Sequence, residues 1–365
     1  RTVYRHLRKV LRRKTIAMKL HASLLFPVSL CGALFLGSAV AQDYVVPRTE
    51  YDQPDLNGVW NFNDSTPFER PDRFGMREFL TSEELAERNT RIDTGQQRRD
   101  ASEAEVSEQI LNVPTNDTGA YNLFWSFYDE PYPNIRTSLI VYPPDGKIPA
   151  TINGVITQRS PPGSNPCNYG GVVIADRPVR VSWGAVSCDR PEDFGLASRC
   201  MTFPQTLAPH IKANSYNNNL QILQTRDHVM IKSELGNDPR IIPLDGRPFL
   251  TEEIRYWTGS SRGHWEGDTL VLETRHFTNK LASLFLRTDS YGNAENSVLT
   301  ERFTRVGEGA LDYEFTIDDP STFTDKITVK TNMSLLNAPI YEFACHEGNY
   351  ALENMLRAAR ILEQP

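Results

Sequence analysis

From about Asn219 onward, the chain alternates between short apolar-rich segments and turns. Eight segments carry β-branched or aromatic residues, and turns rich in Gly, Asp, Asn and Pro separate them. This pattern predicts strands over residues 220–223, 229–231, 240–242, 269–274, 298–305, 311–317, 326–331 and 340–344. Residues 266–268 and 307–309 have the composition of hairpin connections. We therefore expect an all-β protein with an antiparallel barrel, and a β-sandwich is the alternative.

The segment that precedes this body is polar and rich in charge. It contains one short apolar piece, Gly58-Val59-Trp60, and one helical stretch over residues 81–110. Residues 91–100 are too polar to bury a helix face. We interpret residues 42–130 as a partly helical wrap on the surface of a β-rich body. This body spans residues 131–365 and carries a cysteine-bearing insertion near residues 160–200.

The first 41 residues follow the pattern of an export signal. Met18 and Lys19 precede an apolar run over residues 24–36, and an A-x-A cleavage pattern ends at Ala41. This pattern predicts a signal peptide over residues 18–41, a mature chain that begins at Gln42, and a periplasmic or secreted location. The apolar run is shorter than the roughly 20 residues that span a bilayer, so we expect no stable membrane anchor.

The basic residues 1–17 lie before this signal. We interpret them as upstream sequence translated in the wrong place, and a long basic n-region is the alternative. The first 41 residues contain eight basic and no acidic side chains, which leaves 31 basic and 46 acidic side chains after Ala41. A body with a formal charge of −15 repels nucleic acid and anionic lipid surfaces, so we expect neither as a partner. The oligomeric state stays open.

Four cysteines follow the predicted cleavage site. An even number of cysteines in an exported chain favours disulfides, and four cysteines allow three pairings. Cys167 and Cys188 flank a strand-like stretch, which makes a local bridge plausible and leaves Cys200 to pair with Cys345. Free buried thiols are the alternative. No C-x-x-C occurs, which argues against a zinc ribbon or a thioredoxin-type redox centre.

Several segments resemble a group of uncharacterised exported bacterial proteins. The segments are PDLNGVW (54–60), RTSLIV (136–141), PPDGK (143–147), YNNN (216–219), IIPLDGRP (241–248), GHWEGDTLV (263–271), IDDP (317–320) and CHEGN (345–349). The resemblance covers nearly the whole mature chain and implies a shared fold and export, without a particular activity. Separately, Gly58-Val59-Trp60 is similar to the G-x-W start of lipocalins.

Strand alternation identifies candidate catalytic residues, because alternate side chains of a strand face opposite ways. The acids and the histidine that share or extend an apolar face are Glu301, Asp319, Glu342 and His346. We expect these four to converge on one interior pocket, with His276 at its rim. Carboxylates and a histidine in such a pocket would form a general acid/base site.

Each of these residues also has a structural interpretation. Glu301 or Glu342 would instead pair with an arginine, the candidates being Arg247, Arg262 and Arg275. Asp319 would start a turn before Pro320, and either histidine would be satisfied and non-catalytic. No H-E-x-x-H or H-x-H spacing occurs, so we expect no metal site.

The expected function is the binding of a small, largely apolar molecule inside the barrel. The candidate ligand-binding residues are Tyr216, Asn217, Asn219, Arg247 and Trp60. A turn followed by an amide-bearing strand is the alternative for the Tyr216–Asn219 segment. The alternative function is a cofactor-independent isomerase, hydratase or hydrolase. We expect no cofactor, because no phosphate loop or dinucleotide fingerprint is present.

Overall fold

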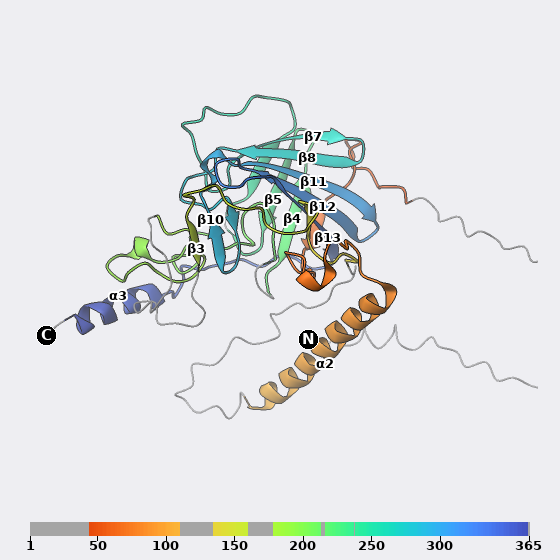
Figure 1. Cartoon of the computed structure of the whole chain (residues 1–365). Helices are drawn as coiled ribbons and strands as arrows, with labels where there is room; N and C mark the ends of the chain where they lie inside the picture. The colour runs from red at the N-terminus through yellow and green to blue at the C-terminus, as the bar shows by residue number, and fades with distance from the viewer. Residues whose placement is uncertain (1–43, 110–133, 160–177, 213–215, 237, 364–365) are drawn as a thin grey trace, which may run out of the picture. The chain divides into compact units, whose positions relative to one another are not determined.

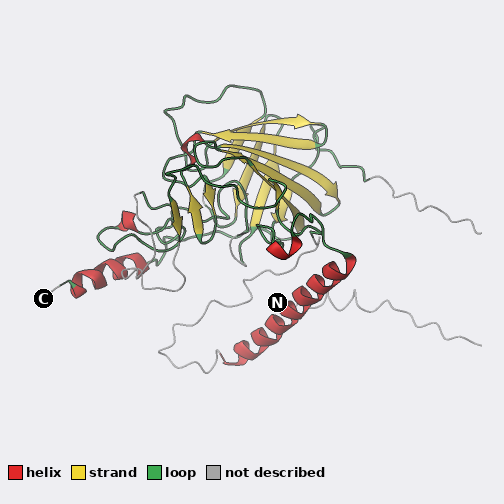
Figure 2. Cartoon of the chain, viewed as in Figure 1, coloured by secondary structure: helices red, strands yellow, loops and turns green. Residues whose placement is uncertain are grey.

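An antiparallel sheet that curls into a nearly closed barrel dominates the structure (Figures 1 and 2). The computed structural model describes residues 44–109, 134–159, 178–212, 216–236 and 238–363. Nine strands follow one another around the barrel in the order β6-β5-β4-β1-β13-β12-β11-β8-β7. Their bounds are β1 Gly58–Asn61, β4 Asn219–Gln224, β5 His228–Ser233, β6 Arg240–Pro243, β7 Ser260–Glu266, β8 Thr269–Arg275, β11 Val298–Gly307, β12 Ala310–Asp318 and β13 Ile327–Leu336.

The remaining strands and helices lie outside this nine-strand path. Strand β2 (Ile140–Tyr142) pairs with β13, and β3 (Thr157–Arg159), β10 (Asp289–Tyr291) and β9 (Leu284–Phe285) form a small separate sheet. The helices within the described residues are the α-helices α2 (Ser82–Gln109) and α3 (Ala351–Leu362) and the short 3-10 helices η1 (Asp72–Phe74), η4 (Pro191–Asp193) and η5 (Ala294–Asn296). In the part of the chain that the structure describes, neither α-helix has the length and apolarity needed to cross a membrane.

The barrel confirms the predicted fold class, and seven of the eight predicted strands form. Both predicted hairpin connections are also present, since β7 ends at Glu266 before β8 and β11 ends at Gly307 before β12. Alternation holds along β11 and β12, where every second side chain is buried. The apolar inward positions of these strands supply much of the core.

The predicted strand over residues 340–344 does not form. Strand β13, which precedes it, already pairs with β12 on one side and with β1 on the other. Residues 340–344 have the composition of a strand, but they find no unpaired strand edge beside β13 and therefore do not join the sheet. The segment is held instead by separate contacts: the Tyr341 N–H donates to the Glu234 carboxylate at 3.1 Å, and the Phe343 ring lies edge-on to Phe203 with 5.5 Å between ring centres.

Strand β1 departs from the predicted surface wrap. It lies inside the sheet between β4 and β13, and its Trp60 is fully buried. The Trp60 indole donates a hydrogen bond to the Leu56 carbonyl at 2.8 Å, and the Arg305 guanidinium lies 5.8 Å from its ring. Helix α2 agrees with the predicted helical stretch. The other predicted segment boundaries, including the insertion near 160–200, stay predictions.

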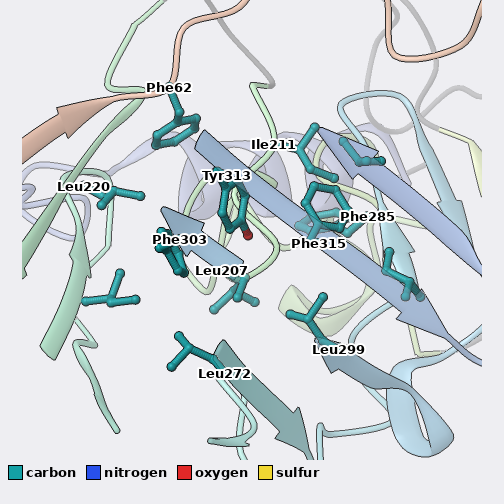
Figure 3. Packing of buried hydrophobic residues seen from close by; sticks show 14 of the residues in the cluster. Phe62, Leu207, Ile211, Leu220, Leu272, Phe285, Leu299, Phe303, Tyr313 and Phe315 are labelled. Atoms are coloured by element: carbon teal, nitrogen blue, oxygen red, sulfur yellow. The ribbon is translucent and has the colours of Figure 1, made fainter. Parts of the chain in front are cut away.

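Residues 203–212, which we call the plug, fill part of the barrel core. Leu207, Ala208 and Ile211 of the plug belong to the same buried cluster as the inward side chains of β11 and β12. Figure 3 shows Leu207 and Ile211 among these side chains. The core of the barrel is therefore built from its strands and from one loop.

The disulfide between Cys200 and Cys345 forms as predicted, with the two Cα atoms 5.7 Å apart. It joins the chain just before the plug to the segment that precedes α3. Cys188 is also disulfide-bonded, and its predicted partner Cys167 lies outside the described residues. The predicted signal peptide likewise lies outside the described residues.

Candidate functional site

Glu301 lies at the centre of a buried polar network in the barrel. Alternation along β11 turns it inward, and its side chain is 0% exposed. Arg240 on β6 donates hydrogen bonds to both carboxylate oxygens, at 2.5 Å and 3.2 Å. The Tyr313 hydroxyl on β12 donates to Oε1 at 2.8 Å. The carboxylate is therefore fully paired, as a buried charge requires.

Arg240 connects strands that the sheet does not connect. Besides Glu301, its guanidinium donates to the hydroxyls of Ser261 on β7 at 3.2 Å and Thr274 on β8 at 3.0 Å. Strands β6 and β7 are the two ends of the sheet order. One side chain thus bridges the gap at which the barrel is not closed by backbone pairing.

His210 of the plug lies beside this network. Its backbone N–H donates to the Tyr313 hydroxyl at 3.1 Å, and its Nδ1 lies 3.4 Å from the Ser233 hydroxyl. Complete burial lowers the pKa of His210 to about 4, although the nearby Glu301 charge acts in the opposite direction. The imidazole is therefore neutral at pH 7.

The electrostatics of the other members agree with a stable ion pair. Burial alone would raise the pKa of Glu301, but the charge and hydrogen bonds of Arg240 lower it below its ordinary value. Burial and the Glu301 charge raise the pKa of Tyr313 well above its ordinary value. At neutral pH, Arg240 is therefore the cation of the network and Glu301 its anion, whereas His210 and Tyr313 are neutral.

The cavities near the plug are small. One, between the plug and β11, has a volume of about 20 Å³, and one beside His210 and Asp64 has about 10 Å³. A cavity of this size holds about one water molecule. These two cavities cannot accommodate the small molecule that we expected inside the barrel. With Arg240 as its partner, Glu301 fits the structural interpretation, although the arginine is not one of the three we named.

The predicted acid/base residues do not converge on one pocket, so this prediction is wrong. Glu342 and His346 are exposed, because the strand that would have turned them inward is absent. Asp319 is buried at the end of β12, where its Oδ1 accepts hydrogen bonds from the N–H and hydroxyl of Ser321. This is the turn that the structural interpretation expected.

His276 follows β8 and is only partly buried. Its backbone is left-handed, with φ of 59°, and its ring lies edge-on to Phe249 with 5.8 Å between ring centres. Arg262 and Arg275 lie 5.0 Å and 5.5 Å from the centre of the same Phe249 ring. Among the described residues, no hydrogen bond or ring contact joins the His276 side chain to Glu301 or to the residues bonded to Glu301.

The predicted ligand-binding residues mostly have protein partners. Asn219 accepts from the Asn61 amide at 2.7 Å and donates to Glu234 at 2.6 Å, which satisfies both ends of its amide. Arg247 is exposed and pairs with Asp245, and the buried Trp60 bonds to Leu56. Asn217 adopts a left-handed backbone (φ 54°) beside the partly buried Tyr216, consistent with a turn before β4.

A cleft at the N-terminal end of α2 is much larger than either cavity beside the plug. Its volume is about 530 Å³, within the range of small-molecule sites. The chain before α2 forms one wall, the first turns of α2 form the second, and residues 136–137 complete it. The lining residues are Ser65, Pro67, Arg73, Phe74, Leu80, Glu84, Glu87, Arg88, Arg91, Ile92, Arg136 and Thr137.

Backbone and side-chain bonds hold the walls of this cleft together. The backbone pairs Leu80 with Ile135 and Thr137 with Glu78, at 2.9 Å in each case. Arg77 makes two hydrogen bonds to Glu84, at 2.5 Å and 2.6 Å, which ties the preceding loop to α2. Arg88 donates from α2 to the Thr66 hydroxyl at 3.2 Å and to the Asn134 carbonyl. The cleft is therefore preformed.

Sequence reasoning missed Arg240, His210 and the cleft. Arg240 shares a face of β6 with Ile242, so alternation could have identified it. His210 belongs to a loop without periodicity, and the cleft is assembled from loops and a polar helix, so no pattern indicated either. Among the described residues, no group of three or more His, Cys, Asp or Glu side chains is placed to hold a metal ion.

Comparison with known proteins adds no assignment. No protein-family description matches the chain, and neither the curated proteins nor the solved structures contain a match. The inference about function therefore depends on the geometry of this chain.

Proposed function

We propose that this protein is an exported small-molecule binding protein whose ligand occupies the cleft beside α2. The observation that carries the proposal is the volume of that cleft, about 530 Å³, together with its mixed lining. Phe74, Leu80 and Ile92 offer apolar contact, and arginines offer hydrogen bonds. Ligand sites commonly combine an apolar wall with a few polar groups that fix orientation.

The proposal retains small-molecule binding as the function, but it places the binding site in the cleft beside α2 and not inside the barrel. The barrel core beside the plug is filled by side chains, whereas the cleft is open. The enzyme alternative has less support, because Glu301 is fully paired and Glu342 and His346 are exposed. A barrel with a paired core is well suited to act as a rigid support for a peripheral site.

A matched pair of fluorescent probes tests the proposal. N-phenyl-1-naphthylamine and 8-anilinonaphthalene-1-sulfonate share one aromatic frame and differ by a sulfonate. We expect saturable binding of at least one probe to the purified mature protein. In Ile92→Trp the larger side chain should obstruct the cleft and abolish this binding. Ile361→Trp places the same substitution at an exposed position of α3 and should leave binding unchanged.

The proposal is overturned if neither probe binds, or if Ile92→Trp binds both as well as the unchanged protein does. Circular dichroism and the thermal midpoint establish that both variants fold. Native mass spectrometry of material purified from the periplasm would then show whether a molecule leaves with the protein and whether Ile92→Trp lacks it.

A further inference from the structure

We infer that the ligand of the cleft is an amphipathic organic anion, with a carboxylate, sulfonate or similar acid group on an apolar body. This inference depends on the proposed function, because it names the ligand class of the same cleft. It rests on the balance of charged side chains in the lining and on the apolar side chains that line the same cleft.

The arginines of the cleft outnumber its available acids. Four lining residues are arginines and two are glutamates. Of the glutamates, Glu84 is engaged by Arg77, whose hydrogen bonds, with that of the Thr81 backbone, lower the pKa of Glu84 to about 2. Of the arginines, Arg136 is engaged by Glu78. Three arginines and one glutamate remain.

The three remaining arginines, Arg73, Arg88 and Arg91, form no ion pair with any residue that the structure describes. Arg88 uses its terminal nitrogens on a hydroxyl and a carbonyl, both neutral groups, and its Nε is buried without a partner. Arg73 lies 4.6 Å above the Phe74 ring, and Arg91 is exposed one turn further along α2. Glu87 lies one turn before Arg91, and no ion pair joins them. The cleft therefore keeps a positive charge.

This local charge contrasts with the chain as a whole, whose formal net charge is −7. Positive side chains concentrated in a concave site of an acidic protein attract small anions and repel cations. The guanidinium group is planar and binds carboxylate or sulfonate oxygens through two parallel hydrogen bonds. Arg73 and Arg91 are the residues available for this contact.

The apolar lining defines the other half of the ligand. Phe74, Leu80 and Ile92 lie in the same cleft as the arginines. An inorganic anion would leave these side chains without contact, and a neutral hydrocarbon would leave the arginines unpaired. An acid group attached to an apolar body satisfies both. The Arg73 guanidinium lies 4.6 Å from the centre of the Phe74 ring, so one ligand can contact both side chains.

The same two probes test the ligand class. We expect the sulfonate probe to bind the unchanged protein about tenfold more tightly than the neutral amine, the effect of one charge-assisted contact. In Arg73→Gln/Arg91→Gln this preference should disappear through weaker binding of the sulfonate, with the amine unaffected. About 0.5 M NaCl should reduce the preference as well, because exposed charges are screened.

A second double variant controls for net charge. Arg190→Gln/Arg287→Gln removes two exposed arginines outside the cleft lining and should keep the preference. Equal affinity of both probes for the unchanged protein would overturn the anion inference and leave the proposed function standing. Binding of neither probe would overturn both. A preference lost equally in both double variants would show a general charge effect and overturn the assignment to Arg73 and Arg91.

Discussion

The guanidinium of Arg240 binds the carboxylate of Glu301 through two hydrogen bonds that cross the interior of the barrel. Arg240 belongs to β6, at one end of the sheet order, and Glu301 belongs to β11, near the other end. Backbone pairing does not join β6 to β7, so this ion pair, with the hydroxyls of Ser261 and Thr274, joins the two ends from inside.

Removing one member of this pair should be far more costly than removing both. Arg240→Met leaves the Glu301 carboxylate buried without a cation, and we expect a loss of about 3–5 kcal/mol in the free energy of unfolding. Arg240→Met/Glu301→Leu should recover most of that loss. Urea denaturation measures both. The control Arg247→Met removes an exposed ion pair and should change stability by less than about 1 kcal/mol. A loss below about 1 kcal/mol in Arg240→Met would contradict a closing role.

His210 should make the protein acid-sensitive. Its pKa is about 4 in the folded chain and 6.5 when unperturbed. Between these values the unfolded chain binds a proton that the folded chain does not, so stability falls as the pH decreases from 6.5 to 4. The contribution amounts to about 3 kcal/mol at pH 4. In His210→Phe, which keeps a ring beside Phe62 and Tyr313, this part of the pH dependence should vanish in urea titrations at pH 7 and pH 5.

Glu301 titrates in the same direction but at lower pH, because its pKa is below its ordinary value in the folded chain. Its contribution is present above the unfolded pKa and is lost as the pH falls through the folded one. The window between pH 6.5 and 5 therefore reports mainly on His210. An unchanged pH dependence in His210→Phe within this window would refute the assignment.

The Cys200–Cys345 disulfide should contribute strongly to stability. It closes a loop over a sequence separation of 145 residues, which corresponds to about 5 kcal/mol in the chain-entropy model. Cys200→Ser/Cys345→Ser should therefore unfold at a much lower urea concentration than the oxidised protein. Non-reducing peptide mapping should recover the two cysteines in one linked peptide. Recovery of both as free thiols from periplasmic material would exclude the bridge.

Export can be tested independently of the fold. Expressed from Met18 in a bacterium, the protein should appear in the periplasm or medium with Gln42 as its first residue, because Ala39 and Ala41 fit the cleavage pattern. N-terminal sequencing decides this. Ala41→Arg, which spoils the cleavage position, should accumulate a longer precursor. A mature protein that retains Met18 would contradict the assignment.

The alternation of apolar and polar residues predicted most strands of the barrel, but it predicted few of the contacts in the candidate site. It placed Glu301 inward because a strand with apolar Leu299 and Phe303 has only one way to face the core. It could not identify Arg240 as the partner, because that contact depends on how the two ends of the sheet meet. The strand expected over residues 340–344 failed for a related reason, since a strand also needs a free edge beside it.

The cleft was beyond sequence reasoning for a different reason. Phe74, Arg73 and Arg91 come from a loop and from a helix with no strongly apolar face, so no periodicity relates them. Tertiary contacts bring these three residues together: residues 78–80 pair with residues 135–137 through their backbones, and Arg77 forms an ion pair with Glu84.

Strand β1 is the one strand of the barrel path that lies outside the part of the chain closed by the Cys200–Cys345 disulfide. Cys200 and Cys345, with the chain between them, form a covalent ring that contains every strand of the barrel path except β1. Within this ring β4 and β13 do not pair with each other, and the four residues of β1 lie between them and pair with both, with Trp60 buried. The Cys200–Cys345 bridge thus links the other strands of the barrel path covalently, and the segment N-terminal to this ring supplies the one strand that the ring lacks, as a fragment does in fragment complementation.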